Sequence, residues 1–176
     1  IYDWHRNGEP LIQNGYTTYL IADEVESVLD NYDSDRPFFF FVPFNAPHSP
    51  SSSNQVPPGI RGEFENNRWA QTFAMDQAIG DIIASLKRHG LYDNTLLIFL
   101  NDNGGVDTNG PYRNGKGSYY EGGVRVPCLI SWPARISDPG DVDAMVHAVD
   151  FYPTLIKVAG ASHRQGLPVD GRDMTG

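Results

Sequence analysis

Runs of apolar residues separate polar, glycine-rich connections along this chain, and their spacing predicts both strands and helices. Apolar runs without polar alternation are typical of strands that are buried on both faces of a sheet. Such runs extend from Phe38 to Val42, from Leu96 to Leu100 and from Val126 to Trp132. We expect a further short strand between Val142 and Val149, and a loop or hairpin in residues 1–15.

Other segments show the apolar spacing of amphipathic helices. A first helix, capped by Thr17 or Thr18, is predicted from apolar residues that share one face. That face consists of Ile21, Val25, Val28 and Leu29. A second helix ends before Gly90, and we interpret its apolar residues as core. These residues are Trp69, Phe73, Ile79, Ile82, Ile83 and Leu86. A third helix is predicted between Asp150 and Gly160.

Strands that alternate with helices predict an α/β fold, which we expect to be a three-layer α/β/α sandwich around a mostly parallel sheet. The 176 residues are enough for one domain with a core of its own. A net charge of −9 disfavours nucleic acid and anionic membranes as partners. No apolar stretch reaches the length of a transmembrane helix. Because the chain begins with Ile1, we interpret it as a piece of a longer protein.

A polar motif follows the apolar run that ends at Leu100. Asp102 and Asn103 stand side by side, and Gly104 and Gly105 come next. Ligands are held at the carboxyl end of a central strand in open α/β sheets. Carboxylate and amide oxygens suit a hard cation such as Ca²⁺ or Mg²⁺, although the same residues also occur in ordinary turns.

A second motif runs from Gly115 to Pro127 and reads Gly-Lys-Gly-Ser-Tyr-Tyr-Glu-Gly-Gly-Val-Arg-Val-Pro. Its glycines permit positive φ and close approach of the backbone, and Lys116 stands among them. Tyr119 and Tyr120 are placed to wall a pocket. Upstream, the prolines around His48 stiffen the loop that carries this histidine and fix its direction.

These motifs, in this order, resemble the type I sulfatases of the alkaline phosphatase superfamily. The C-terminal catalytic half of that family carries an Asp-Asn-Gly metal motif and then a Gly-Lys-Gly-x-x-x-Glu-Gly-Gly-x-Arg-x-Pro loop. Its Pro-His-x-Pro segment corresponds to Pro47 to Pro50 here. The resemblance runs from about Tyr16 to Asp173, implies the same three-layer fold, and favours a periplasmic or extracellular location.

The resemblance implies roles for individual residues. Asp102 and Asn103 are the expected Ca²⁺ ligands, whereas Lys116 and His48 are the expected catalytic residues that contact a sulfate ester. Candidates for substrate binding in the variable loop are Asn109, Tyr112 and Arg113. We expect Glu121 and Arg125 to form a buried pair that supports the glycine loop.

The family's nucleophile is a formylglycine made from Cys or Ser in a Cys/Ser-x-Pro-x-Arg motif. Cys128 lacks that motif and is expected in the core. Ser131 has the spacing, but it follows the glycine loop, where the family has an unrelated Trp-Pro turn. We therefore expect the nucleophile in an N-terminal part of the same domain that precedes Ile1, and a C-terminal subdomain after the chain. The chain alone is then predicted to be inactive.

Three other functions stay open at this point. A phosphate-ester hydrolase of the same superfamily would need several histidine and aspartate ligands for Zn²⁺, and this chain has 5 histidines. A pseudo-sulfatase that binds sulfated glycans would keep Lys116 and His48 without the nucleophile. A structural module would have no use for Asp102, Lys116 and His48 together.

Overall fold

The computed structural model describes residues 4–33, 36–106, 109–164 and 166–175. The chain divides into two compact units. The first unit holds residues 4–32 and 40–137, and the second holds residues 33, 36–39 and the described residues from 138 onward. All residues that the sequence predicts to form a site lie in the first unit.

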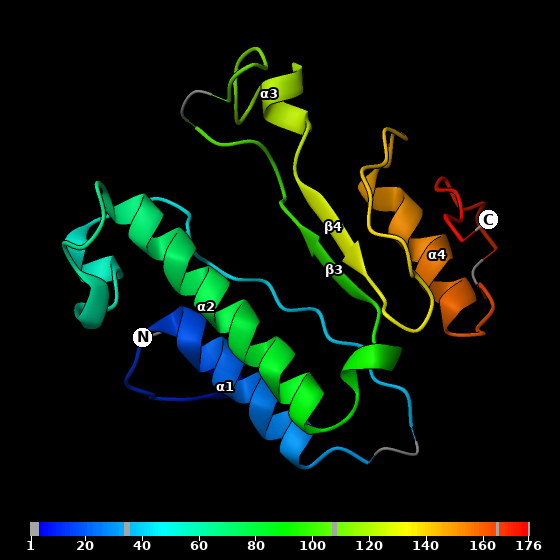
Figure 1. The fold of residues 1–176 in the computed structure, drawn as a ribbon, viewed down its shortest axis with the longest axis horizontal. Coiled ribbons are helices and arrows are strands. Elements are labelled where there is room, and N and C mark those ends of the chain that lie inside the picture. The colour runs from blue at the N-terminus through cyan, green and yellow to red at the C-terminus, as the bar shows by residue number, and fades with distance from the viewer. Residues whose placement is uncertain (1–3, 34–35, 107–108, 165, 176) are drawn as a thin grey trace. The chain divides into compact units, whose positions relative to one another are not determined.

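Two helices of the first unit, α1 (Thr17–Asp30) and α2 (Asn67–Arg88), lie side by side (Figure 1). Small side chains on one face of α2 and larger ones on α1 fill the contact between them. The buried apolar residues are Leu20, Ala22, Val25 and Leu29 in α1, and Ala70, Ala74, Ala78 and Leu86 in α2. Alanines four residues apart share a helix face, and they allow α1 to approach closely.

Both helices confirm the predicted segments, but part of the predicted core is wrong. Trp69 is 64% exposed, and Phe73 and Val28 are also exposed. Trp69 and Phe73 each precede a buried alanine by one position, which turns them about 100° around the helix axis from the packed face. The N-cap of α1 is Tyr16, so Thr17 and Thr18 lie inside the helix rather than capping it.

The strands in the described part of the chain form two antiparallel pairs. In the first pair, β1 (His5–Arg6) and β2 (Glu9–Pro10) make the predicted N-terminal hairpin. In the second, β3 (Leu97–Leu100) pairs with β4 (Cys128–Ser131), with Leu97 opposite Ser131 and Leu100 opposite Cys128. Short 3₁₀ turns occupy Ser53–Gln55, Pro58–Ile60 and Tyr92–Asn94.

Three strand predictions need correction. Residues 38–42 and 142–147 form no strand in the described structure, and Phe39 and Phe41 are exposed. Cys128, predicted in the core, is exposed on β4. A strand needs a neighbour that accepts and donates its backbone hydrogen bonds, and the described residues supply such neighbours only in β1–β2 and β3–β4. Because both pairs are antiparallel, the described residues do not confirm a mostly parallel sheet.

The second unit is built on α4 (Phe151–Val158), as predicted, preceded by a 3₁₀ turn at Ala148–Asp150. Gly160 follows with φ 62°, the left-handed conformation that ends a helix. The Asp150 carboxylate accepts hydrogen bonds from the backbone N–H groups of His147 and Arg172. These bonds hold the C-terminal tail against the start of α4, which supports a structural role for this helix.

Candidate active site

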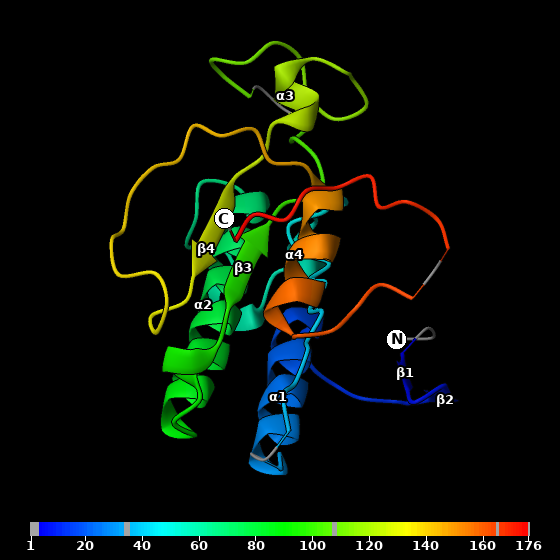
Figure 2. The same ribbon diagram turned by 90° about the vertical axis from the view of Figure 1, so that its right-hand side faces the viewer.

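Residues 101–127 connect β3 to β4, so both predicted motifs lie at the same end of this strand pair (Figures 1 and 2). The connection carries one short helix, α3 (Glu121–Val124). Because β3 and β4 are antiparallel, the chain that leaves β3 at Asn101 must return to the same end before β4 begins. The strand pairing therefore brings the Asp102 motif and the Lys116 motif together.

Glycines in α3 let the surrounding backbone approach it closely. Gly122 and Gly123 are buried, and a Cβ atom at Gly122 would lie 2.6 Å from the Arg113 carbonyl oxygen. A Cβ atom at Gly123 would lie 2.6 Å from the carbonyl oxygen of Gly115. The Gly122 N–H donates to the Arg113 carbonyl oxygen over 3.0 Å. The Gly-Gly pair is thus required for the backbone on both sides of Lys116 to pack against α3.

The side chain of Asn109 ties the connection together from within. Its Oδ1 accepts from the N–H of Gly105 at 3.0 Å, and its Nδ2 donates to the Gly105 carbonyl oxygen at 2.9 Å. The same Nδ2 lies 3.2 Å from the carbonyl oxygen of Asn114. Gly105 in turn accepts the backbone N–H of Lys116 at 2.9 Å. Asn109, predicted to bind substrate, therefore engages its amide in holding the backbone around Lys116.

The two predicted catalytic side chains meet in the structure. Nζ of Lys116 lies 3.1 Å from Nε2 of His48, although 68 residues separate them in the sequence. Nδ1 of His48 lies 2.6 Å from the carbonyl oxygen of Ser49, which can only accept a hydrogen bond. From these partners we assign the proton to Nδ1, which leaves the Nε2 lone pair facing the Lys116 ammonium. Both side chains are exposed, so the pair is open to a ligand.

Asp102 and Asn103 follow the end of β3 as predicted. Oδ1 of Asp102 accepts the backbone N–H of Asn103 at 2.9 Å. Within the part of the chain that the structure describes, no three His, Cys, Asp or Glu side chains gather as a metal site. Two adjacent oxygen donors fit a hard cation in kind, but Ca²⁺ usually takes six to eight oxygens.

A hollow of about 670 Å³ lies beside Lys116. Tyr112 and Asn109 line it, whereas Arg113 does not and instead stacks its guanidinium 3.8 Å from the Tyr120 ring centroid. Tyr119 is fully exposed and lines no part of this hollow. Of the three variable-loop residues predicted to bind substrate, Asn109 holds the loop backbone and Arg113 lies outside the hollow. Tyr112 is the one that lines the hollow without such a bracing role.

The predicted support pair forms, but it is not buried. Nη1 of Arg125 lies 3.5 Å from Oε2 of Glu121, one turn apart on α3, and both side chains are exposed. The guanidinium of Arg125 also lies 5.0 Å from the centroid of the Tyr112 ring. Arg125 therefore links the last turn of α3 to a residue that lines the hollow.

Comparison with known proteins identifies the family. The family model described as Sulfatase matches residues 1–161. The chain belongs to the sulfatase family. Its relatives include the sulfatase YdeN of Escherichia coli K12, described as uncharacterized, at 33% identity over 94% of this chain. Arylsulfatase A of Homo sapiens is 34% identical over 92% of it. The predicted resemblance is confirmed.

Solved structures share the fold of this chain. The crystal structure of Ps i-CgsB in complex with k-i-k-neocarrahexaose matches 96% of the chain with a TM-score of 0.87 and 32% identity. This likeness supports the predicted α/β class. The sulfatase chain spans 31% of YdeN, 32% of human arylsulfatase A and 39% of the Ps i-CgsB chain, about a third of these proteins. In the described ranges, none of its helices has the length and apolarity needed to cross a membrane.

The two residues considered as nucleophiles in this sulfatase chain, Cys128 and Ser131, are the first and last residues of β4. Partial burial raises the pKa of the Cys128 thiol, which disfavours the reactive thiolate. Ser131 pairs with Leu97 at the far end of the ladder from Cys128 and Leu100, where the connection begins. The raised thiol pKa disfavours Cys128 as a nucleophile, and its place at the far end of the ladder disfavours Ser131.

Proposed function

We propose that the full-length protein hydrolyses sulfate esters, and that Lys116 and His48 contact the sulfate group. The observation that carries this proposal is the 3.1 Å approach of Nζ of Lys116 to Nε2 of His48. The Gly-Gly packing of α3 holds the backbone around Lys116, and His48 meets its ammonium from 68 residues away in the sequence. Lys116 is exposed, lies between two glycines and contacts a histidine, which is not expected of a lysine with a purely structural role.

Lys116 supplies a fixed positive charge next to the position of the sulfate. As the S–O bond breaks, negative charge grows on the leaving oxygen, and a positioned ammonium stabilises that charge more than it stabilises the ground state. Its backbone N–H is anchored to Gly105, so the residue enters the reaction already oriented. Lys116 is therefore assigned to neutralise charge on the sulfate and on the leaving oxygen.

His48 is assigned to hydrogen bonding and proton transfer at the same group. The Ser49 carbonyl oxygen fixes the direction of its ring through Nδ1. Nε2 then faces Lys116. Once Nε2 is protonated, a sulfate oxygen that displaces this 3.1 Å contact can accept from both side chains. When Nε2 carries a proton, the imidazolium can give it to the leaving alcohol, which is general acid catalysis.

Two further components of the reaction are proposed from family membership. A Ca²⁺ ion held in part by Asp102 and Asn103 would offset the charge of the sulfate, and a formylglycine from an N-terminal part of the same domain would supply the nucleophile. Asp102 and Asn103 give two of the six to eight oxygens that Ca²⁺ takes, so the remaining ligands would come from that part. In the complete domain we propose the three-layer sandwich and the mostly parallel sheet.

A sulfated glycan is the proposed substrate class. Support comes from two structures that this chain resembles. One is Ps i-CgsB in complex with k-i-k-neocarrahexaose, and the other is a sulfatase from glycosaminoglycan metabolism by bacteroides thetaiotaomicron, with a TM-score of 0.81 and 26% identity. The open hollow beside Lys116 leaves room for a ligand larger than sulfate itself.

The proposal is tested by measuring ester hydrolysis with a matched pair of substrates. The full-length protein is incubated with 4-nitrophenyl sulfate and with 4-nitrophenyl phosphate, in Ca²⁺ and in Zn²⁺. We expect nitrophenol release from the sulfate ester in Ca²⁺. Faster release from the phosphate ester in Zn²⁺ would identify a phosphatase, and binding of sulfated glycans without release from either ester would identify a pseudo-sulfatase.

A further inference from the structure

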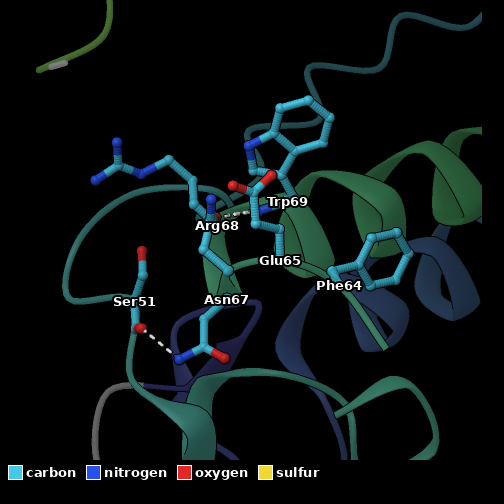
Figure 3. Close-up of a pocket in the computed structure, with 7 residues that line it drawn as sticks. Ser51, Phe64, Glu65, Asn67, Arg68 and Trp69 are labelled. Atoms are coloured by element: carbon cyan, nitrogen blue, oxygen red, sulfur yellow. Dashed lines mark hydrogen bonds between the residues drawn. The ribbon is translucent and has the colours of Figure 1, made fainter. Parts of the chain in front are cut away.

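A second pocket, away from the glycine loop, has no place in the chemistry described above. It has a volume of about 440 Å³ and lies between Ser51 and the first turn of α2 (Figure 3). Its lining is Ser51, Phe64, Glu65, the N-cap Asn66 and the helix residues Asn67, Arg68 and Trp69. Resting on the proposed function, we propose that this pocket binds a sugar unit of the glycan next to the unit whose sulfate is removed.

The pocket is built from two chain segments that are fixed to each other. Nδ2 of Asn67 donates to the Ser51 carbonyl oxygen at 2.9 Å, which is drawn as a dashed line in Figure 3. One turn further along α2, the buried Gln71 donates from Nε2 to the Gln55 carbonyl oxygen at 3.3 Å. Phe64 packs on Phe73 with ring centroids 5.0 Å apart. The walls are therefore held in place before a ligand arrives.

The chemistry of the lining suits a sugar. Trp69 lines the pocket and is 64% exposed, and an indole offers a flat apolar face together with an N–H donor. Arg68 and Glu65 add a cation and a carboxylate that can bond hydroxyl groups, and Arg68 suits an anionic substituent. A mixed lining of this kind matches a ring that has apolar C–H faces and a polar edge.

An unsatisfied hydroxyl group also points to a ligand. Oγ of Ser51 is buried and has no hydrogen-bond partner among the described residues. In Figure 3 it points away from Asn67, toward the side on which the Arg68 guanidinium lies. Buried hydroxyl groups are normally hydrogen-bonded, so a ligand hydroxyl that enters the pocket would complete the bonding of Ser51.

The pocket also lies within reach of the candidate active site. Ser51 follows His48 by three residues in the same proline-rich loop, so their Cα atoms are at most about 11 Å apart. An oligosaccharide with one sulfate at Lys116 and His48 can therefore extend into the pocket. A small aryl sulfate cannot occupy both places, which gives the proposal a selective test.

The test compares two kinds of substrate in the full-length protein. One is 4-nitrophenyl sulfate, and the other is the best substrate among k-i-k-neocarrahexaose and sulfated glycosaminoglycan oligosaccharides. We expect Trp69→Ala to raise KM for the oligosaccharide roughly tenfold, which corresponds to about 1.4 kcal/mol, with kinetics on the aryl sulfate unchanged. Trp69→Phe keeps an aromatic face and should recover part of the loss.

A charge variant and its control complete the experiment. Arg68→Ala should also raise the oligosaccharide KM, whereas Arg88→Ala, about 30 Å away at the other end of α2, should not. Equal losses on both substrates with a lowered melting temperature would show that Trp69 packs against the rest of the protein, and would overturn the proposal. Activity on the aryl sulfate without activity on any oligosaccharide would also overturn it. No activity on either substrate would overturn the proposed function itself.

Discussion

Replacing Gly122 by alanine should displace the loop that carries Lys116. A Cβ atom at this position would lie 2.6 Å from the Arg113 carbonyl oxygen and still closer to that of Asn114. Both oxygens belong to backbone, which cannot move aside as a flexible side chain would. The N–H of Gly122 also donates to the Arg113 oxygen, so the clash falls on a bond that holds the loop to α3.

The expected magnitude follows from this overlap. An added carbon in a fully packed place typically costs about 1–3 kcal/mol in the free energy of unfolding. Lys116 lies two residues beyond Asn114, so a shift of the loop moves the ammonium relative to His48. A misplacement of about 1 Å in a catalytic group can lower the rate by about 10²-fold. We therefore expect a larger effect on kcat than the change in stability alone would suggest.

The assay is kcat on 4-nitrophenyl sulfate together with a thermal melt of the full-length protein. Gly59→Ala is the matched control, because among the described residues no heavy atom beyond its chain neighbours lies within 4 Å of a Cβ built there. The control should keep wild-type kcat and be as stable as wild type, or slightly more stable. Wild-type kcat and melting temperature in Gly122→Ala would refute the argument that backbone packing on α3 positions Lys116.

Three further changes test other parts of the account. Asn109→Asp removes the donations to Gly105 and Asn114 and should cost roughly 1–3 kcal/mol, seen as a lower melting temperature with reduced kcat; wild-type values would exclude the bracing role. Asp102→Ala should weaken Ca²⁺ binding in calorimetry of the full-length protein, and unchanged affinity would remove Asp102 from the metal site. Hydrogen bonds from Lys157, and then from Thr175, lower the pKa of Asp173 to about 2, below its usual value near 3.9. The Lys157–Asp173 pair therefore stabilises the fold fully above about pH 3.9 and progressively less as the pH falls toward 2. The melting-temperature difference between wild type and Asp173→Asn should shrink over that acid range, and a difference independent of pH would contradict this.

The sequence predicted the helices well, because these depend on local patterns. α1, α2 and α4 follow from apolar spacing and end signals such as Gly90, and the glycines around Lys116 indicated close backbone packing. The residues that contact Lys116 and brace its loop were harder to predict from the sequence. No spacing rule shows that Asn109 binds Gly105, because that bond depends on how the connection folds back.

Burial was predicted least well, because it depends on which neighbours an element has. The run at 38–42 has the composition of a central strand, yet it forms no strand in the described structure. Trp69 has the character of a core residue, but the alanines of α2 form the face that packs on α1. Periodicity shows that a helix has an apolar face; it does not show whether large or small side chains make the contact.

The most direct test of the central claim is a double-mutant cycle on Lys116 and His48, read as kcat/KM for sulfate ester hydrolysis. If both side chains act on one sulfate group, each alanine variant should lose about 10²–10³-fold, as for other lost electrostatic stabilisers. The double variant should then lose far less than the product of the two, because residues that act as a unit are not additive. Lys87→Ala should keep wild-type activity. Losses that multiply, or no loss in either single variant, would contradict a shared role at the sulfate.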